Sequence, residues 1–405
     1  MKTLSFVLII FLFIGCGGPA REPIKVLNNQ DTTFVAQQPM QLKKSFKKLI
    51  EQGDRNKVLN YQKIALDAYQ LGYKDISKKF FDKALDEIET VYSNEENARK
   101  ARSLWYSEGK KDFKGEPYER VMTFYYRGLQ YLEDKDYENA RASFKSAMLQ
   151  DAFAEEEQNQ CDFSLVVLLD AISSKYNGDI DLYHEALKDV TLLKPDLDIP
   201  EEYNTVILLE TGNSPRKVSD GLGHSQLKFR RGRKFKEDIA LVTIDNNTME
   251  APVIEDIYWQ ATSRGGRYFD SLLKGKANFK KVSGELAESL GKISSTTTLI
   301  SSAGIGGDSL GAVGAGLGLI SGIALMSSVS SDARADTRYW NNIPNKVHIL
   351  FATLPPGQHS FRLEFANKDG EVINSLTKYE TVTINPTNNI FNFSSRDRIS
   401  YSYRK

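Results

Sequence analysis

The sequence predicts an α+β protein of several domains, with a helical repeat region in its first half, a glycine-rich helical hairpin and a small C-terminal β-sandwich. Three observations lead to this prediction. Small and aromatic residues recur at helical spacing within residues 41–205, glycines recur in an uncharged stretch at 309–331, and short alternating apolar runs follow residue 336. A chain of 405 residues is long enough for several domains, since one domain takes roughly 100–200 residues.

The N-terminal end has the pattern of an export signal. Residues 1–3 form a short basic start, and residues 4–14 form an apolar run that only Ser5 interrupts. This run is too short to span a bilayer, which needs roughly 20 apolar residues, but it suits the central region of a signal peptide. We therefore expect residues 1–15 to be a signal peptide.

The residues after this run resemble a bacterial lipobox, in which a small residue precedes a cysteine. Gly15 and Cys16 fit the pattern, whereas Phe13 departs from its usual leucine. The resemblance implies cleavage before Cys16 and lipid on its sulfur, and two or three acyl chains hold a protein stably at a membrane. Because Gly17 is not aspartate, we expect the outer membrane and a periplasmic orientation. The alternative is an ordinary secretory signal with a chance cysteine.

Residues 16–40 show no sustained periodicity and are predicted to be a lipidated tether. Cys161 is the second of two cysteines, so lipid on Cys16 leaves no intramolecular disulfide. Cys161 precedes an apolar run at 163–169. It is expected to be a small buried hydrophobe, and the alternative is a reactive thiol.

Residues 41–205 contain three copies of a two-helix pattern. The clearest copy places small and aromatic residues on both sides of a turn at 134–137: Gly128, Tyr131, Ala140, Phe144 and Ala147. It resembles the tetratricopeptide repeat, in which small residues let two antiparallel helices approach closely. Looser copies surround turns at 72–73 and 177–179.

Two interpretations are open for this helical region. In one, the helices form a curved stack that binds a peptide or a helix of another envelope protein. In the other, they form a helical domain without a ligand. Most of the tyrosines and phenylalanines within the repeats are expected to lie in the core under either interpretation.

Residues 206–255 are predicted to be rich in strands, because the runs at 205–210 and 239–244 are apolar and partly β-branched. Between them, residues 228–236 include six basic residues in nine. This segment suits a solvated loop or a lysine-protected edge strand, or else a contact with anionic lipid or an acidic partner. Lys plus Arg and Asp plus Glu each total 53, so no nucleic-acid partner is expected.

Residues 256–335 are predicted to form helices around a glycine-rich segment. Residues 309–331 carry no charge, and five glycines near or within them would line one groove of a helix: Gly307, Gly311, Gly314, Gly318 and Gly322. One interpretation is a segment that enters a membrane or associates with itself there, as a possible homo-oligomer, since helices of about 20 apolar residues cross bilayers. The other is half of a soluble helical hairpin that turns at 306–307.

Residues 336–405 are predicted to form a β module. Alternating or β-branched runs lie at 348–353, 359–365, 379–384 and 390–393, with turn signals at 354–357 and 367–370.

Three short motifs stand near the junctions of these parts. They are residues 115–122 (GEPYERVM), then Glu210, Gly212, Pro215 and Lys217, and finally Asp336, Arg338, Trp340 and Pro344. Together with the order of the parts, they resemble a family of bacterial lipoproteins with tetratricopeptide-like repeats and a C-terminal β module. The resemblance implies an outer-membrane or periplasmic location and supplies no activity.

The sequence contains no recognisable catalytic or cofactor motif. Its four histidines, His184, His224, His348 and His359, lack metal-ligand spacing, and no nucleophile elbow or phosphate-binding loop occurs. We therefore expect neither an enzyme nor a cofactor. The predicted function is a membrane-anchored scaffold or adaptor for envelope proteins. The alternative is a membrane-inserting or oligomer-forming protein that uses residues 309–331.

Overall fold

The computed structural model describes residues 24–93, 112–152, 161–220, 226–263 and 336–396. Within these residues the chain is α+β, as predicted, with helices in the first half and mainly strands after residue 205. The predicted signal peptide and the lipidation site Cys16 lie outside the described residues. The same holds for the five groove glycines, Gly307, Gly311, Gly314, Gly318 and Gly322.

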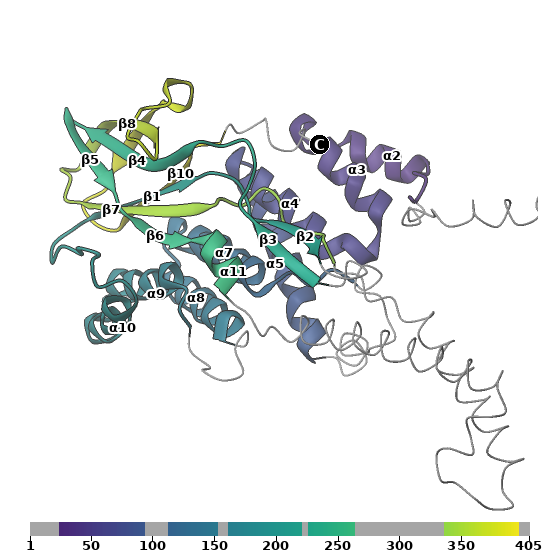
Figure 1. The fold of residues 1–405 in the computed structure, drawn as a ribbon, viewed down its shortest axis with the longest axis horizontal. Helices are drawn as coiled ribbons and strands as arrows, with labels where there is room; N and C mark the ends of the chain where they lie inside the picture. Colours follow the sequence, from purple (N-terminus) through teal and green to yellow (C-terminus); the bar gives the residue numbers. More distant parts are fainter. Residues whose placement is uncertain (1–23, 94–111, 153–160, 221–225, 264–335, 397–405) are drawn as a thin grey trace, which may run out of the picture.

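The helices of the first half follow one another as pairs joined by short turns (Figure 1). After α2 (Asn29–Ala36) and α3 (Lys43–Gln52) come three pairs: α4 (Lys57–Gln70) with α5 (Lys74–Ser93), α7 (Pro117–Glu133) with α8 (Tyr137–Ala152), and α9 (Ser164–Asn177) with α10 (Ile180–Leu193). Their turns fall where the sequence predicts them, so the three helix pairs are confirmed. Their assignment to the tetratricopeptide repeat remains a prediction.

Gly128 explains how closely α7 and α8 pack. A Cβ atom at Gly128 would lie 2.5 Å from Cε1 of Phe144 in the neighbouring helix, closer than two carbons can approach. Ala140, Phe144 and Ala147 are all fully buried on the facing side of α8. The predicted role of these small residues in helix contact is therefore confirmed for this pair.

The strands described form two four-stranded sheets and one two-stranded ribbon. The central sheet has the order β10-β1-β7-β6, and its strands are β10 (Asn389–Ser394), β1 (Thr205–Thr211), β7 (Lys346–Ala352) and β6 (Val253–Asp256). The outer sheet has the order β5-β4-β8-β9, with β5 (Asn247–Ala251), β4 (Glu237–Ile244), β8 (Gly357–Asn367) and β9 (Lys378–Ile384). The ribbon pairs β2 (Arg216–Asp220) with β3 (Gln226–Arg230), and the short helix α11 (Ile257–Ser263) follows β6.

Strand β1 is covered on both faces. Val206 and Leu208 belong to a core shared with the helices, whereas Ile207 and Leu209 belong to a second core shared with the outer sheet. Such a strand has a continuous apolar sequence rather than an alternating one, as residues 205–210 do. The central sheet therefore lies between a layer of helices and the outer sheet (Figure 1).

The two predicted strand regions share both sheets. β1 pairs in parallel with β10 and antiparallel with β7, and β4 pairs antiparallel with β8. In the central sheet, strands from residues 346–394 alternate with strands from residues 205–256, and in the outer sheet the two groups meet at the β4–β8 pair, so the C-terminal strands do not form sheets of their own. The domain limits proposed at residues 206, 255 and 336 remain predictions. Sequence patterns do not reveal pairing between strands so far apart in the chain.

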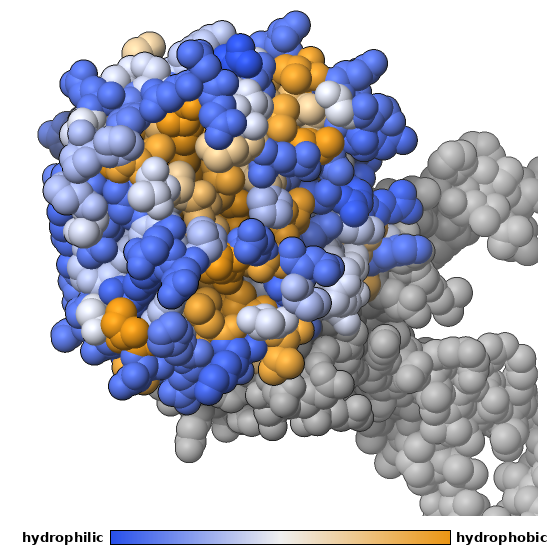
Figure 2. All heavy atoms as spheres, turned by 90° about the vertical axis from the view of Figure 1, so that its left-hand side faces the viewer, coloured by the Kyte–Doolittle hydropathy of each residue, from blue (hydrophilic) through white to orange (hydrophobic). Residues whose placement is uncertain are grey.

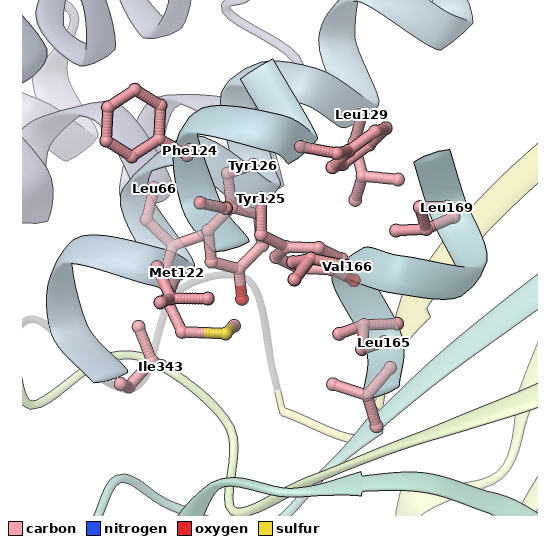
Figure 3. Close-up of a cluster of buried hydrophobic side chains, with 14 of the residues drawn as sticks. Leu66, Met122, Phe124, Tyr125, Tyr126, Leu129, Leu165, Val166, Leu169 and Ile343 are labelled. Carbon is pink, nitrogen blue, oxygen red and sulfur yellow. The ribbon is translucent and has the colours of Figure 1, made fainter. Parts of the chain in front are cut away.

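Side chains from the helices and from the chain after residue 336 meet in one hydrophobic core. Figure 3 shows Met122 and Tyr125 of α7 beside Val166 and Leu165 of α9, with Ile343 approaching from below. All five are buried. The helices and the central sheet are therefore held together by a continuous apolar interior.

Candidate functional site: a cleft beside the edge strand

Residues from the three sequence motifs meet at one buried ion pair. Nζ of Lys217 lies 3.1 Å from Oε1 of Glu116 and 3.0 Å from Oε2 of Glu119. The backbone N–H of Trp340 donates a hydrogen bond of 2.6 Å to the other oxygen of Glu119. Burial alone would lower the pKa of Lys217, but the charges of Glu116 and Glu119 outweigh it and raise this pKa. The motifs therefore have a structural role, joining α7, β2 and the segment before β7.

Residues 336–345 lie against the helices that the sequence analysis assigned to ligand binding. The ring of Trp340 lies 6.0 Å from that of Tyr126 and is fully buried. Nδ2 of Asn342 donates a hydrogen bond of 2.9 Å to Oδ1 of Asp67 in α4. This part of the helix pairs is therefore covered by residues 336–345 of the same chain.

A cleft of about 440 Å³ opens where the helix turns meet strands β9 and β10. Its volume falls within the range of roughly 300–1,000 Å³ that is usual for ligand sites. The helix-side wall comes from the α4–α5 and α7–α8 turns and includes Tyr69, Gln70, Lys74, Glu133 and Lys135. The opposite wall comes from β9 and the following loop and includes Lys378, Glu380, Thr383, Asn385 and Asn388. Between the walls run residues 389–394 of β10, with Glu210 and Arg396.

Strand β10 forms the edge of the central sheet on this side, with β1 as its strand partner among the described residues. Phe391 and Phe393 pack into the core shared with the outer sheet, whereas Ile390 packs against the core shared with the helices. The strand edge between these two sets of side chains borders the cleft. Its backbone groups are therefore part of the site.

Two amide side chains in the cleft have polar atoms without a partner. Nε2 of Gln70 and Oδ1 of Asn392 are both shielded from solvent and make no hydrogen bond within the described part of the chain. One is a donor and the other an acceptor. Buried polar groups are nearly always hydrogen-bonded, so such atoms indicate a bound water or ligand group.

The helix-side wall carries a partly buried carboxyl group, that of Glu133. Oη of Tyr69 donates a hydrogen bond of 2.5 Å to Oε1 of Glu133, and Nζ of Lys74 lies 3.7 Å from the other oxygen. Burial raises the pKa of Glu133, although Tyr69 and Lys74 act in the opposite direction. Burial also raises the pKa of Tyr69 well above its usual value. Tyr69 therefore keeps its proton and acts as a donor.

The base of the cleft contains a second, fully buried pair. Nη2 of Arg396 lies 2.6 Å from Oε2 of Glu210, and Nδ2 of Asn392 donates to Oε1 of Glu210 at 3.2 Å. Arg396 also donates to the carbonyl oxygen of Asn342. These charges compensate each other, so they shape the cleft rather than act as an acid and a base.

His348 and Cys161 do not line the cleft. His348 is buried between Oγ1 of Thr211 and the carbonyl oxygen of Ala251, each 3.0 Å away. Cys161 is half-buried against the helix core, and burial raises its thiol pKa, as expected of a packing residue. No cluster of three or more His, Cys, Asp or Glu residues that could hold a metal occurs within the described ranges.

Apolar residues also gather on the molecular face seen in Figure 2, where a hydrophobic band runs between hydrophilic margins. Among the described side chains of the helix pairs, Leu192 of α10 is the most exposed large apolar one, at 81%. Such a surface has no directional groups that would select a ligand. The cleft beside β10 combines a strand edge with unpaired amides and is the better-defined site.

Comparisons of the chain with known protein families, with curated proteins and with solved structures find no match. Among the described residues, no helix combines the length and the apolar character needed to cross a membrane.

Apart from Glu210, which belongs to one of the three motifs, the cleft residues were not singled out as a site from the sequence. Tyr69 and Glu133 are more than sixty residues apart in the sequence, and Asn392 lies beyond the helices altogether. One local signal was present: residues 385–392 (NPTNNIFN) contain four asparagines, which are unusual in a strand region. The sites predicted from sequence, Cys16 and the five glycines, lie outside the described residues.

Proposed function

We propose that this protein is a membrane-anchored lipoprotein that acts as a non-enzymatic adaptor or scaffold for protein partners in the bacterial cell envelope. The observation that carries the proposal is the cleft beside β10, because a strand edge flanked by polar walls suits binding rather than chemistry. One wall belongs to the turns of the helix pairs. We thus keep the predicted repeat region as the partner-binding part of the chain, with the contact at the turns of its helix pairs.

The anchor in this proposal is lipid on Cys16, with the outer membrane as the location and the periplasm as the facing compartment. Its support is the apolar run at 4–14 followed by Gly15 and Cys16. Acyl chains there would leave residues 24–396 free to meet a partner at the membrane surface. The proposed membership of the family of tetratricopeptide-like lipoproteins has the same support, together with the confirmed helix pairs.

Mass spectrometry of the mature protein tests the anchor. We expect the wild type to begin at Cys16 with the mass of two or three acyl chains, and the Cys16→Ala variant to carry none. Lipid on the Cys16→Ala variant, or a mature chain that begins elsewhere, would contradict the proposal. A Cys161→Ala variant is the matched control and should retain the lipid.

A second candidate function is membrane insertion or self-association through residues 309–331. The observation that favours it is the absence of charge in this stretch, together with the spacing of its glycines. Extraction without detergent separates the two functions. If the Cys16→Ala protein is recovered as a soluble monomer, insertion is excluded and the adaptor remains.

A further inference from the structure

We propose that the cleft binds an extended segment of a partner protein as an additional strand on the central sheet, beside β10. The inference rests on the proposed adaptor function and names the chemistry of the ligand. That ligand is a peptide backbone in the extended conformation whose side chains are polar and uncharged. Strand addition of this kind takes its affinity from backbone hydrogen bonds and its selectivity from the pockets for alternate side chains.

The register of β10 shows which of its backbone groups face the cleft. The N–H of Asn389 donates to the carbonyl oxygen of Asn204 at 2.9 Å, and the N–H of Ser395 donates to that of Glu210 at 2.8 Å. Backbone groups of alternate residues point to the same side of a strand, so the odd-numbered residues of β10 face β1. The N–H and C=O groups of Ile390 and Asn392 therefore point toward the open edge.

The end of this edge is closed by a lysine. Nζ of Lys378 donates to the carbonyl oxygen of Ser394, which also points away from β1. Lysines on edge strands are one way in which proteins limit unwanted pairing. Because Lys378 occupies the edge at Ser394, an incoming strand pairs with the edge only around Ile390 and Asn392. The added segment is therefore short and needs the two walls for the rest of its contacts.

The walls supply those contacts. Side chains of an extended segment alternate between its two faces, so one set would meet Tyr69 and Gln70 and the other set would meet Thr383. Nε2 of Gln70 and Oδ1 of Asn392 are a buried donor and a buried acceptor without a partner. Because both atoms are shielded from solvent, a polar group of the ligand would pair with them only after these side chains turn toward the cleft, and an apolar ligand would leave them unsatisfied.

The charges of the cleft favour an uncharged segment. Two carboxylates of the cleft already have partners: Oε2 of Glu210 lies 2.6 Å from Nη2 of Arg396, and Oε1 of Glu133 lies 2.5 Å from Oη of Tyr69. Basic and acidic residues occur on both sides of the cleft in nearly equal number. A strongly charged peptide would find no excess of the opposite charge there.

Photo-cross-linking in intact cells identifies the occupant. A photoreactive amino acid replaces Thr383 in the full-length lipidated protein, and a matched variant carries it at Leu192, which is exposed outside the cleft. We expect the Thr383 position to link to one segment of another protein, whose sequence mass spectrometry identifies. A link to residues 397–405 of the same chain, to a second copy or to a glycan would overturn the proposal.

The identified segment is then made as a synthetic peptide and added to the purified full-length chain. We expect hydrogen exchange of the Ile390 and Asn392 amides to slow at least tenfold, while the Phe391 and Phe393 amides, which already face β1, do not change. Equal protection of all four amides, or of none, would contradict strand addition. This measurement uses the wild-type protein and does not depend on the folding of any variant.

Two substitutions of Asn392 separate the contribution of its backbone N–H from that of its side chain. Asn392→Val and Asn392→Pro both lose the side-chain hydrogen bond to Glu210, but only the proline also lacks the N–H. Proline is tolerated on edge strands where the N–H faces away from the sheet. We expect the peptide to bind the proline variant at least tenfold more weakly than the valine variant, and equal binding would contradict the inference.

The outcomes separate this inference from the proposed function. A partner that cross-links at Leu192 but not at Thr383 would overturn strand addition and leave the adaptor function standing. Absence of any cross-linked protein at both positions would contradict the adaptor function itself.

Discussion

The carboxylate of Glu255, near the end of β6, accepts a hydrogen bond from the backbone N–H of Leu165 in the first turn of α9, with 3.2 Å between N and Oε2. The hydroxyl of Ser164 donates to the same oxygen at 3.0 Å, and Nε2 of Gln260 donates to the other oxygen at 3.1 Å. Burial raises the pKa of Glu255 to about 7, although Lys194 and these hydrogen bonds act against it. The third helix pair is thus joined to the central sheet by a group that titrates near neutral pH.

Replacement of Glu255 by glutamine should make stability less dependent on pH. Its folded-state pKa of about 7 lies above the unfolded value of roughly 4.3, so the folded protein binds more protons between these values. The stability that protonation contributes is therefore lost as pH rises through this window. At pH 8 the free energy of unfolding of the Glu255→Gln variant should exceed that of the wild type by up to roughly 4 kcal/mol, and at pH 5 by much less. Urea unfolding at both pH values measures this, and an equal difference at both would contradict it.

The buried imidazole of His348 should reduce the stability of the protein as the pH falls, which is opposite to the effect of Glu255. Burial lowers its pKa to about 4, below the unfolded value of roughly 6.5. The unfolded chain then binds more protons in this window, so stability is lost as pH falls from about 6.5 to 4. A His348→Gln variant should lose stability less steeply over this range than the wild type does. Urea unfolding at several pH values between about 4 and 6.5 measures the two slopes, and equal slopes for the two proteins would contradict the prediction.

Gly128→Ala should destabilise the protein although alanine favours helices. Helix propensity alone predicts a gain of about 1 kcal/mol, but the new Cβ would lie 2.5 Å from the ring of Phe144. Overpacking of this kind costs about 1–3 kcal/mol. The variant should therefore unfold at lower urea concentration than the wild type. The Gly128→Ala change should cost less stability in a Phe144→Leu background than in the wild type. The prediction fails if Gly128→Ala stabilises the protein in both backgrounds.

Lys217→Met should destabilise the protein strongly, because it leaves Glu116 and Glu119 without their buried partner. Removal of one member of a buried ion pair costs about 3–5 kcal/mol. A double variant that also carries Glu119→Gln should lose less than the sum of the two single changes, since no unpaired charge then remains at that position. Unfolding free energies of the four proteins give the coupling, and simple additivity would contradict the role assigned to the pair.

The helix pairs could be predicted because their signals are local. Gly178 ends α9 with a φ of +88°, a backbone angle that favours glycine, and the turn at 134–137 separates two stretches of helical spacing. The contact between Gly128 and Phe144 likewise follows from residues sixteen positions apart in one hairpin. Six of the ten described strands, β1, β4, β7, β8, β9 and β10, were located to within two residues for the same reason, because apolar alternation and turn residues act over a few positions. The strands β2, β3, β5 and β6 were not located individually.

The candidate site could not be predicted in this way. Ile390 and Asn392 gain an open edge only because β10 pairs with β1, nearly two hundred residues earlier in the chain. Gln70 and Asn392 face one cleft only because the helix pairs pack on the central sheet. Neither relationship leaves a periodic signal in the sequence.

The sequence alone indicated the three helix pairs with their turns, six of the ten described strands, and where a lipid anchor is expected. It did not indicate α2, which lies within the predicted tether. The features that it did indicate depend on short-range sterics and on the spacing of apolar residues, which a single segment contains. Only the tertiary structure decided that strands from both halves of the β region share two sheets, that residues 336–345 cover the helices, and that a polar cleft remains beside β10. Those outcomes depend on burying apolar surface between segments that are distant in the chain, and the free energy of that burial belongs to the assembled fold rather than to any one segment.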